Sequence, residues 1–156
     1  LILYFRWMRL SQLDPRGLSL SRVLQFVGIG ILLCIFGYVL TKYGREVFGK
    51  NMGGGWRPDF WGAIACIFIS PFFEEIIYRG VILERLAGRV NSYLALLVTS
   101  LLFAADHWRG DYGAFTLFLT MLPTNFIYLR VRSVPLMMVI HSTYNAVLVF
   151  CCAFKF

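Results

Sequence analysis

The sequence predicts an all-α fold, a polytopic bundle of about five transmembrane helices that forms a single membrane domain over residues 1–156. The chain is 59% hydrophobic and 15% charged, with a mean hydropathy of +0.71. Soluble domains are about 45–50% apolar and about 25% charged. The apolar residues also form long runs that are separated by short polar connections. These observations exclude a soluble cytoplasmic enzyme, a disordered tail and a secreted disulfide scaffold.

The N-terminal segment, residues 1–22, mixes apolar side chains with four arginines and predicts an interfacial helix or the remnant of a truncated span. Because the chain starts at Leu1 and not at Met, we expect further residues upstream. Residues 23–40 carry no charge and would reach about 27 Å as a helix, close to the hydrocarbon thickness, so they predict the first transmembrane helix. Further spans are predicted at residues 60–78, 93–105, 112–129 and 135–154.

The net charge of +7 arises from 15 Lys and Arg residues against eight acidic residues. The basic residues flank the apolar runs, which predicts contact with anionic lipid headgroups and no nucleic-acid partner. With the N-terminus in the cytoplasm, the inner loops hold nine Lys and Arg residues and the outer loops six, which favours that orientation. The four cysteines lie in apolar runs without metal-ligand spacing, so we interpret them as small buried apolar residues.

Two acids and an arginine interrupt the second predicted span. An ionisable group at membrane depth costs at least about 2.5–3.5 kcal/mol, so such residues are first treated as functional. Glu75 and Arg79 are four residues apart and share a helix face, whereas Glu74 lies about 100° away. Arg79 can therefore neutralise Glu75 and leave Glu74 facing elsewhere. The alternative is that both acids lie beyond the hydrocarbon edge and are solvated, but the apolar pattern continues past them.

Two histidines and an asparagine follow in the later spans. His107 comes four residues after Phe103 at the end of the third span, where it is either interfacial or functional, with Asp106 and Asp111 as loop carboxylates or as groups that orient it. His141 lies inside the fifth span, and Asn145, four residues on, shares its face. This pair is either an inter-helix hydrogen-bonding pair or part of a site.

If these groups converge, they supply a general base, an oxyanion donor and a polarised water. At this point the sequence resembles the CAAX-protease and bacteriocin-processing family, the Abi-type intramembrane glutamic endopeptidases. The resemblance covers about residues 60–150, which we take as the protease-like core. Its three motifs occur in the family's order, as Glu74-Glu75-x-x-x-Arg79, Phe103-x-x-x-His107 and His141-x-x-x-Asn145.

The resemblance implies a role for each of these residues. Glu74 activates the attacking water with help from His107, and Arg79 pairs with Glu75. His141 and Asn145 stabilise the oxyanion. No metal or other cofactor is implied, and the substrate is a membrane-associated protein or peptide. Family members process prenylated C-termini, bacteriocin-related proteins or sorting signals, and we expect a multi-pass protein in the plasma membrane of a prokaryote.

Three alternatives stay open at this stage. A metal-dependent protease would use Glu74, His107 and His141 as ligands, although the sequence contains no HExxH motif. A non-catalytic immunity or partner-binding membrane protein would use the polar pairs for helix association. A proton transporter would use Glu and His as a relay, and would need a polar path across the whole bilayer.

Overall fold

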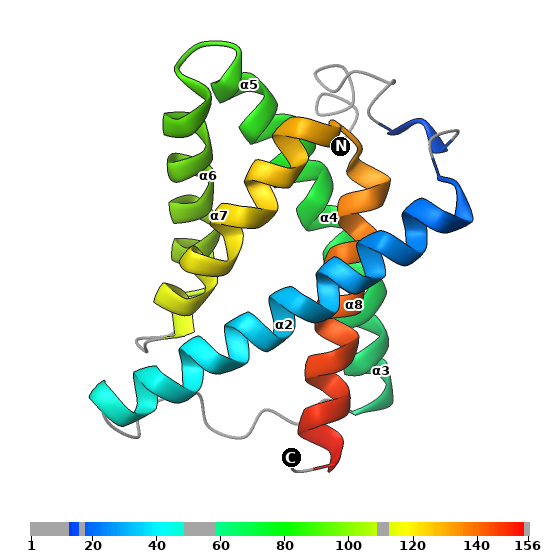
Figure 1. The fold of residues 1–156 in the computed structure, drawn as a ribbon, viewed down its shortest axis with the longest axis vertical. Coiled ribbons are helices and arrows are strands. Elements are labelled where there is room, and N and C mark those ends of the chain that lie inside the picture. Colours follow the sequence, from blue (N-terminus) through cyan, green and yellow to red (C-terminus); the bar gives the residue numbers. More distant parts are fainter. Residues whose placement is uncertain (1–12, 16–17, 49–58, 109–112, 155–156) are drawn as a thin grey trace.

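The computed structural model describes residues 13–15, 18–48, 59–108 and 113–154 (Figure 1). These ranges fold into helices and contain no strand, which confirms the predicted fold class. The N-terminal interfacial helix was predicted within residues 1–22, most of which lie outside the described ranges. The helices are α2 (Leu20–Phe48), a long helix that comprises α3 to α5 (Phe60–Ala87), α6 (Ser92–Asp106), α7 (Gly113–Val131) and α8 (Val134–Phe154).

Four of these helices are long and apolar enough to cross a membrane: Leu20–Gly44, Phe60–Ala87, Gly113–Val131 and Val134–Cys151. The protein is therefore an integral membrane protein. α6 is the exception, because its 15 residues reach only about 22 Å against a hydrocarbon core of about 30 Å. The third predicted span thus exists as a helix that is shorter than the bilayer core, and it ends at His107, which lines the cavity described below.

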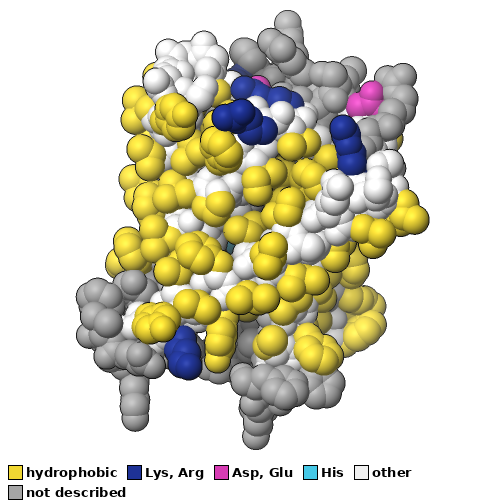
Figure 2. Space-filling view, viewed as in Figure 1, with side chains coloured by type: hydrophobic (Ala, Val, Ile, Leu, Met, Phe, Trp, Pro, Cys, Tyr) yellow, Lys and Arg dark blue, Asp and Glu magenta, His cyan; other side chains and the backbone are white. Residues whose placement is uncertain are grey.

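The outer surface is covered by apolar side chains, as expected for a protein whose composition predicts contact with a lipid bilayer. Leu24, Leu32, Phe68 and Leu101 are each more than 60% exposed, and hydrophobic side chains cover most of the face shown in Figure 2. Several Lys and Arg side chains gather at its upper edge. A soluble protein rarely exposes so continuous an apolar surface, whereas lipid solvates it.

The helix from Phe60 to Ala87 begins at Asp59, whose carboxylate accepts a hydrogen bond of 2.7 Å from the Gly62 amide. It contains two π-helical stretches, η3 (Ala65–Ile69) and η4 (Glu75–Leu83), on either side of α4 (Ser70–Glu74). It continues through α5 (Glu84–Ala87), nine residues beyond the predicted end at residue 78. That prediction was wrong because the Arg79 side chain is buried inside the bundle, so its charge does not mark the end of the span.

α2 crosses α7 and α8 obliquely (Figure 1) and packs closely against α8. Two glycines permit this approach. A Cβ atom on Gly30 would lie 2.8 Å from the Ile140 carbonyl oxygen, and one on Gly37 would lie 2.7 Å from the Tyr144 hydroxyl. Small residues are common where membrane helices approach closely. This packing brings α2 over the cavity that holds the polar residues.

Candidate active site

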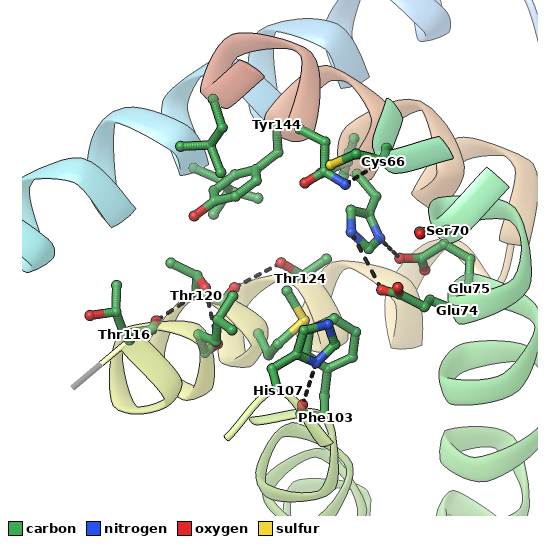
Figure 3. Close-up of a pocket in the computed structure, with 18 of the residues that line it drawn as sticks. Cys66, Ser70, Glu74, Glu75, Phe103, His107, Thr116, Thr120, Thr124 and Tyr144 are labelled. Atoms are coloured by element: carbon green, nitrogen blue, oxygen red, sulfur yellow. Dashed lines mark hydrogen bonds and ion pairs between the residues drawn. The ribbon is translucent and has the colours of Figure 1, made fainter. Parts of the chain in front are cut away.

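A cavity of about 620 Å³ lies between the helices. All six residues singled out from the sequence line it, and they come from the helix Phe60–Ala87, from the end of α6 and from α8. Figure 3 shows Glu74 and Glu75 at one end of the cavity and Thr116 and Thr120 at the other. Its volume is typical of a ligand pocket. The six residues are Glu74, Glu75, Arg79, His107, His141 and Asn145.

Glu75 is the fixed acid of the pair. Its side chain is fully buried, and its Oε1 accepts hydrogen bonds from Arg79 Nη1 at 2.9 Å and from His141 Nδ1 at 2.8 Å. The ion pair expected from the four-residue spacing is therefore present. Arg79 also donates from Nη2 to the Met121 sulfur at 2.8 Å, and its guanidinium lies 5.4 Å from the centre of the Phe103 ring. The alternative in which both acids are solvated beyond the hydrocarbon edge is wrong, because Glu75 is buried in the bundle.

Glu74 is the more exposed acid of the pair. Its side chain is 23% exposed, and its Oε2 lies 3.7 Å from His141 Nε2. The two acids therefore differ in burial and in their pairing with Arg79, although both line the cavity and both approach the His141 ring. Glu74 is the fifteenth of the 28 residues in Phe60–Ala87, about 21 Å from the start of that helix, which is near its middle.

His107 has a defined tautomer. Its Nδ1 lies 2.8 Å from the Phe103 carbonyl oxygen, and its ring stacks on that of Phe103 with centroids 4.4 Å apart. A carbonyl only accepts, so Nδ1 carries the proton and Nε2 of the neutral ring keeps a lone pair. The Nδ1 atom of this histidine is held by the Phe103 carbonyl and not by Asp106, and Asp111 lies outside the described residues.

Asn145 is bound to the backbone of the acidic helix. Its Nδ2 donates to the Cys66 carbonyl oxygen at 2.8 Å, within the π-helical stretch η3. The two backbone acceptors, Cys66 and Phe103, were not predicted, since a carbonyl group has no signature in a sequence. Three threonines that line the cavity from α7 were not predicted either, although their spacing of four residues is visible in the sequence: Thr116, Thr120 and Thr124.

The part of the chain that the structure describes brings no three His, Cys, Asp or Glu side chains together in an arrangement that could hold a metal ion. Glu75 and His141 instead contact each other directly. The Glu74, His107 and His141 set of the metal-dependent alternative therefore has no preformed ligand geometry among these residues.

A comparison with known families agrees with this geometry. The sequence model of the type II CAAX prenyl endopeptidase Rce1-like family matches residues 56–147. This range contains all six candidate residues and makes up more than half of the chain. The chain belongs to this family. The resemblance noted in the sequence is thereby confirmed, and the Rce1-like protein is a CAAX-type membrane protease, a hydrolase that acts on a peptide or protein. No curated protein and no solved structure matches the chain.

Proposed function

We propose that this Rce1-like protein is an intramembrane endopeptidase that hydrolyses a peptide bond with a water activated by Glu74. The proposal is supported above all by the different contacts and exposure of the two acids. Glu75 is occupied by Arg79 and His141, whereas Glu74 turns a partly exposed carboxylate into the cavity. A carboxylate in a water-poor cavity is a suitable general base.

In the first step, water donates one proton to the Glu74 carboxylate and a hydrogen bond to the lone pair of His107 Nε2. The water oxygen attacks the scissile carbonyl carbon, which forms a C–O bond and moves the carbonyl electron pair onto the oxygen. In the second step this oxyanion collapses, the C–N bond breaks, and the proton held by Glu74 passes to the leaving nitrogen. The products are a carboxylic acid and an amine, and Glu74 regains its starting state.

Two groups on α8 are suited to stabilise the oxyanion. His141 donates its Nδ1 proton to Glu75, so its Nε2 donates to the oxyanion when the ring is an imidazolium. With that charge, Glu74, Glu75, Arg79 and His141 are neutral as a group, which limits the cost of holding them in a low dielectric. Asn145 has a second N–H besides the one that binds Cys66. One such donor is worth about 10²–10³ in rate.

The proposed substrate is a membrane-associated protein or peptide. The cavity of about 620 Å³ is large enough for a short peptide segment, since it falls within the usual range of about 300–1,000 Å³ for ligand pockets. Its threonine-lined end, opposite the acids in Figure 3, supplies room for residues on one side of the scissile bond.

The direct test is Glu74→Gln in the purified full chain, reconstituted in liposomes with a fluorescence-quenched peptide that ends in a prenylated CAAX sequence. We expect kcat to fall by about 10²–10⁴-fold, because the amide cannot accept the proton. Glu84→Gln is the matched control, since Glu84 lies ten residues further along the same helix and outside the cavity lining. Full activity in Glu74→Gln would reject the proposal.

A further inference from the structure

We propose that Pro71 is a positioning residue of the active site. Because Pro71 has no backbone N–H, it cannot compete with the Asn145 amide for the Cys66 carbonyl oxygen. The proposal rests on the hydrolytic function argued above and adds a residue that touches none of the reacting atoms. It explains why a proline stands three residues before Glu74 in the middle of a membrane-spanning helix, where proline normally removes a hydrogen bond.

The hydrogen bonds around Cys66 carry the argument. In an α-helix the Ser70 N–H would bind the Cys66 carbonyl, but here it donates to Ala65, five residues back, as part of the π-helical stretch η3. If the five-residue spacing of η3 continued by one more position into α4, the helix donor for the Cys66 carbonyl would be the N–H of residue 71. Proline has none. The Asn145 side chain on α8 donates to that carbonyl instead, at 2.8 Å.

This bond fixes an amide that faces the reaction site. One N–H of Asn145 is held by Cys66, so the plane of the amide is set and its second N–H is available toward the cavity that Asn145 lines. Pro71 and Glu74 belong to the same short helix, α4. A single side-chain bond therefore sets the oxyanion donor on α8 relative to the general base on the helix that it contacts.

The prediction is tested by a cycle of Pro71→Ala and Asn145→Ala in the liposome assay with the prenylated CAAX peptide. The backbone N–H that Pro71→Ala introduces competes with Asn145 for the Cys66 carbonyl. We expect kcat to fall by about threefold to tenfold, the value of one hydrogen bond, with KM unchanged. In the Asn145→Ala background the same Pro71→Ala change should have no further effect on kcat. Additive losses would overturn the proposal.

A backbone substitution separates the missing N–H from the shape of the proline ring. The α-hydroxy analogue of alanine, introduced at position 71, has the side chain of alanine but an ester oxygen in place of the N–H. We expect it to restore wild-type kcat, whereas equal kcat values for this ester and for Pro71→Ala would overturn the proposal. Pro123→Ala is the matched control, since Pro123 lies within α7 and outside the cavity lining.

If Pro71→Ala does not fold, a second variant tests the same hydrogen bond. An ester between Cys66 and Ile67 weakens the Cys66 carbonyl as an acceptor, and it should lower kcat in the wild type but not in Asn145→Ala. An equal loss in both backgrounds would overturn the proposal. Failure of the hydrolytic function itself is recognised separately, because Glu74→Gln would then retain its activity.

Discussion

Removal of the Arg79 side chain should destabilise the protein far more than removal of a surface arginine. Arg79→Met keeps a long, flexible side chain but removes the guanidinium that pairs with Glu75, so the buried polar cluster is left with one uncompensated negative charge. The side chains of Arg79 and Glu75 are at most 1% exposed. Breaking a buried ion pair from one side costs about 3–5 kcal/mol. This is a large fraction of a typical total stability of about 5–15 kcal/mol.

The measurement is reversible unfolding in mixed micelles, followed by tryptophan fluorescence. Arg132→Met is the matched control, because Arg132 also pairs with a glutamate, Glu84, but its side chain is 42% exposed. An exposed pair is worth about 0–1 kcal/mol. The double variant Glu75→Gln with Arg79→Met should recover most of the lost stability, since no unpaired charge stays buried.

Two results would refute this reasoning. If Arg79→Met costs no more than Arg132→Met, the buried carboxylate is not stabilised by the guanidinium. If the double variant is as unstable as Arg79→Met alone, the loss comes from packing around Phe103 and Met121, which the guanidinium also contacts, and not from an uncompensated charge.

Two further predictions concern helix packing and metal dependence. Gly30→Ala should cost about 1–3 kcal/mol by overpacking, because its Cβ would lie 2.8 Å from the backbone carbonyl oxygen of Ile140, whereas Gly28→Ala, with nothing within 4 Å, should be neutral in the same unfolding assay. Equal effects of the two changes would contradict the packing argument. Peptide cleavage should survive exhaustive chelation, and loss of activity that added Zn²⁺ restores would instead favour the metal-dependent alternative with Glu74, His107 and His141.

The sequence by itself determined the features that depend on local spacing and on solvent. Long apolar runs predicted the membrane helices, since a bilayer demands satisfied backbone groups and apolar side chains. The four-residue spacing of Glu75 and Arg79 predicted their ion pair, because residues i and i+4 share a helix face. The adjacent position of Glu74 predicted that Arg79 would pair with Glu75 and not with Glu74, and the ion pair of Arg79 is with Glu75.

Tertiary structure alone decided which groups meet across helices. His141 contacts Glu75 from 66 positions away, and Asn145 reaches the Cys66 carbonyl from 79 positions away. These contacts depend on how α8 packs against a helix whose hydrogen bonding shifts to a π pattern before Pro71. Every residue has the same backbone carbonyl group, so the sequence does not indicate which carbonyl groups accept a hydrogen bond from a side chain. The tautomer of His107 depends on such a carbonyl, which only the folded chain reveals.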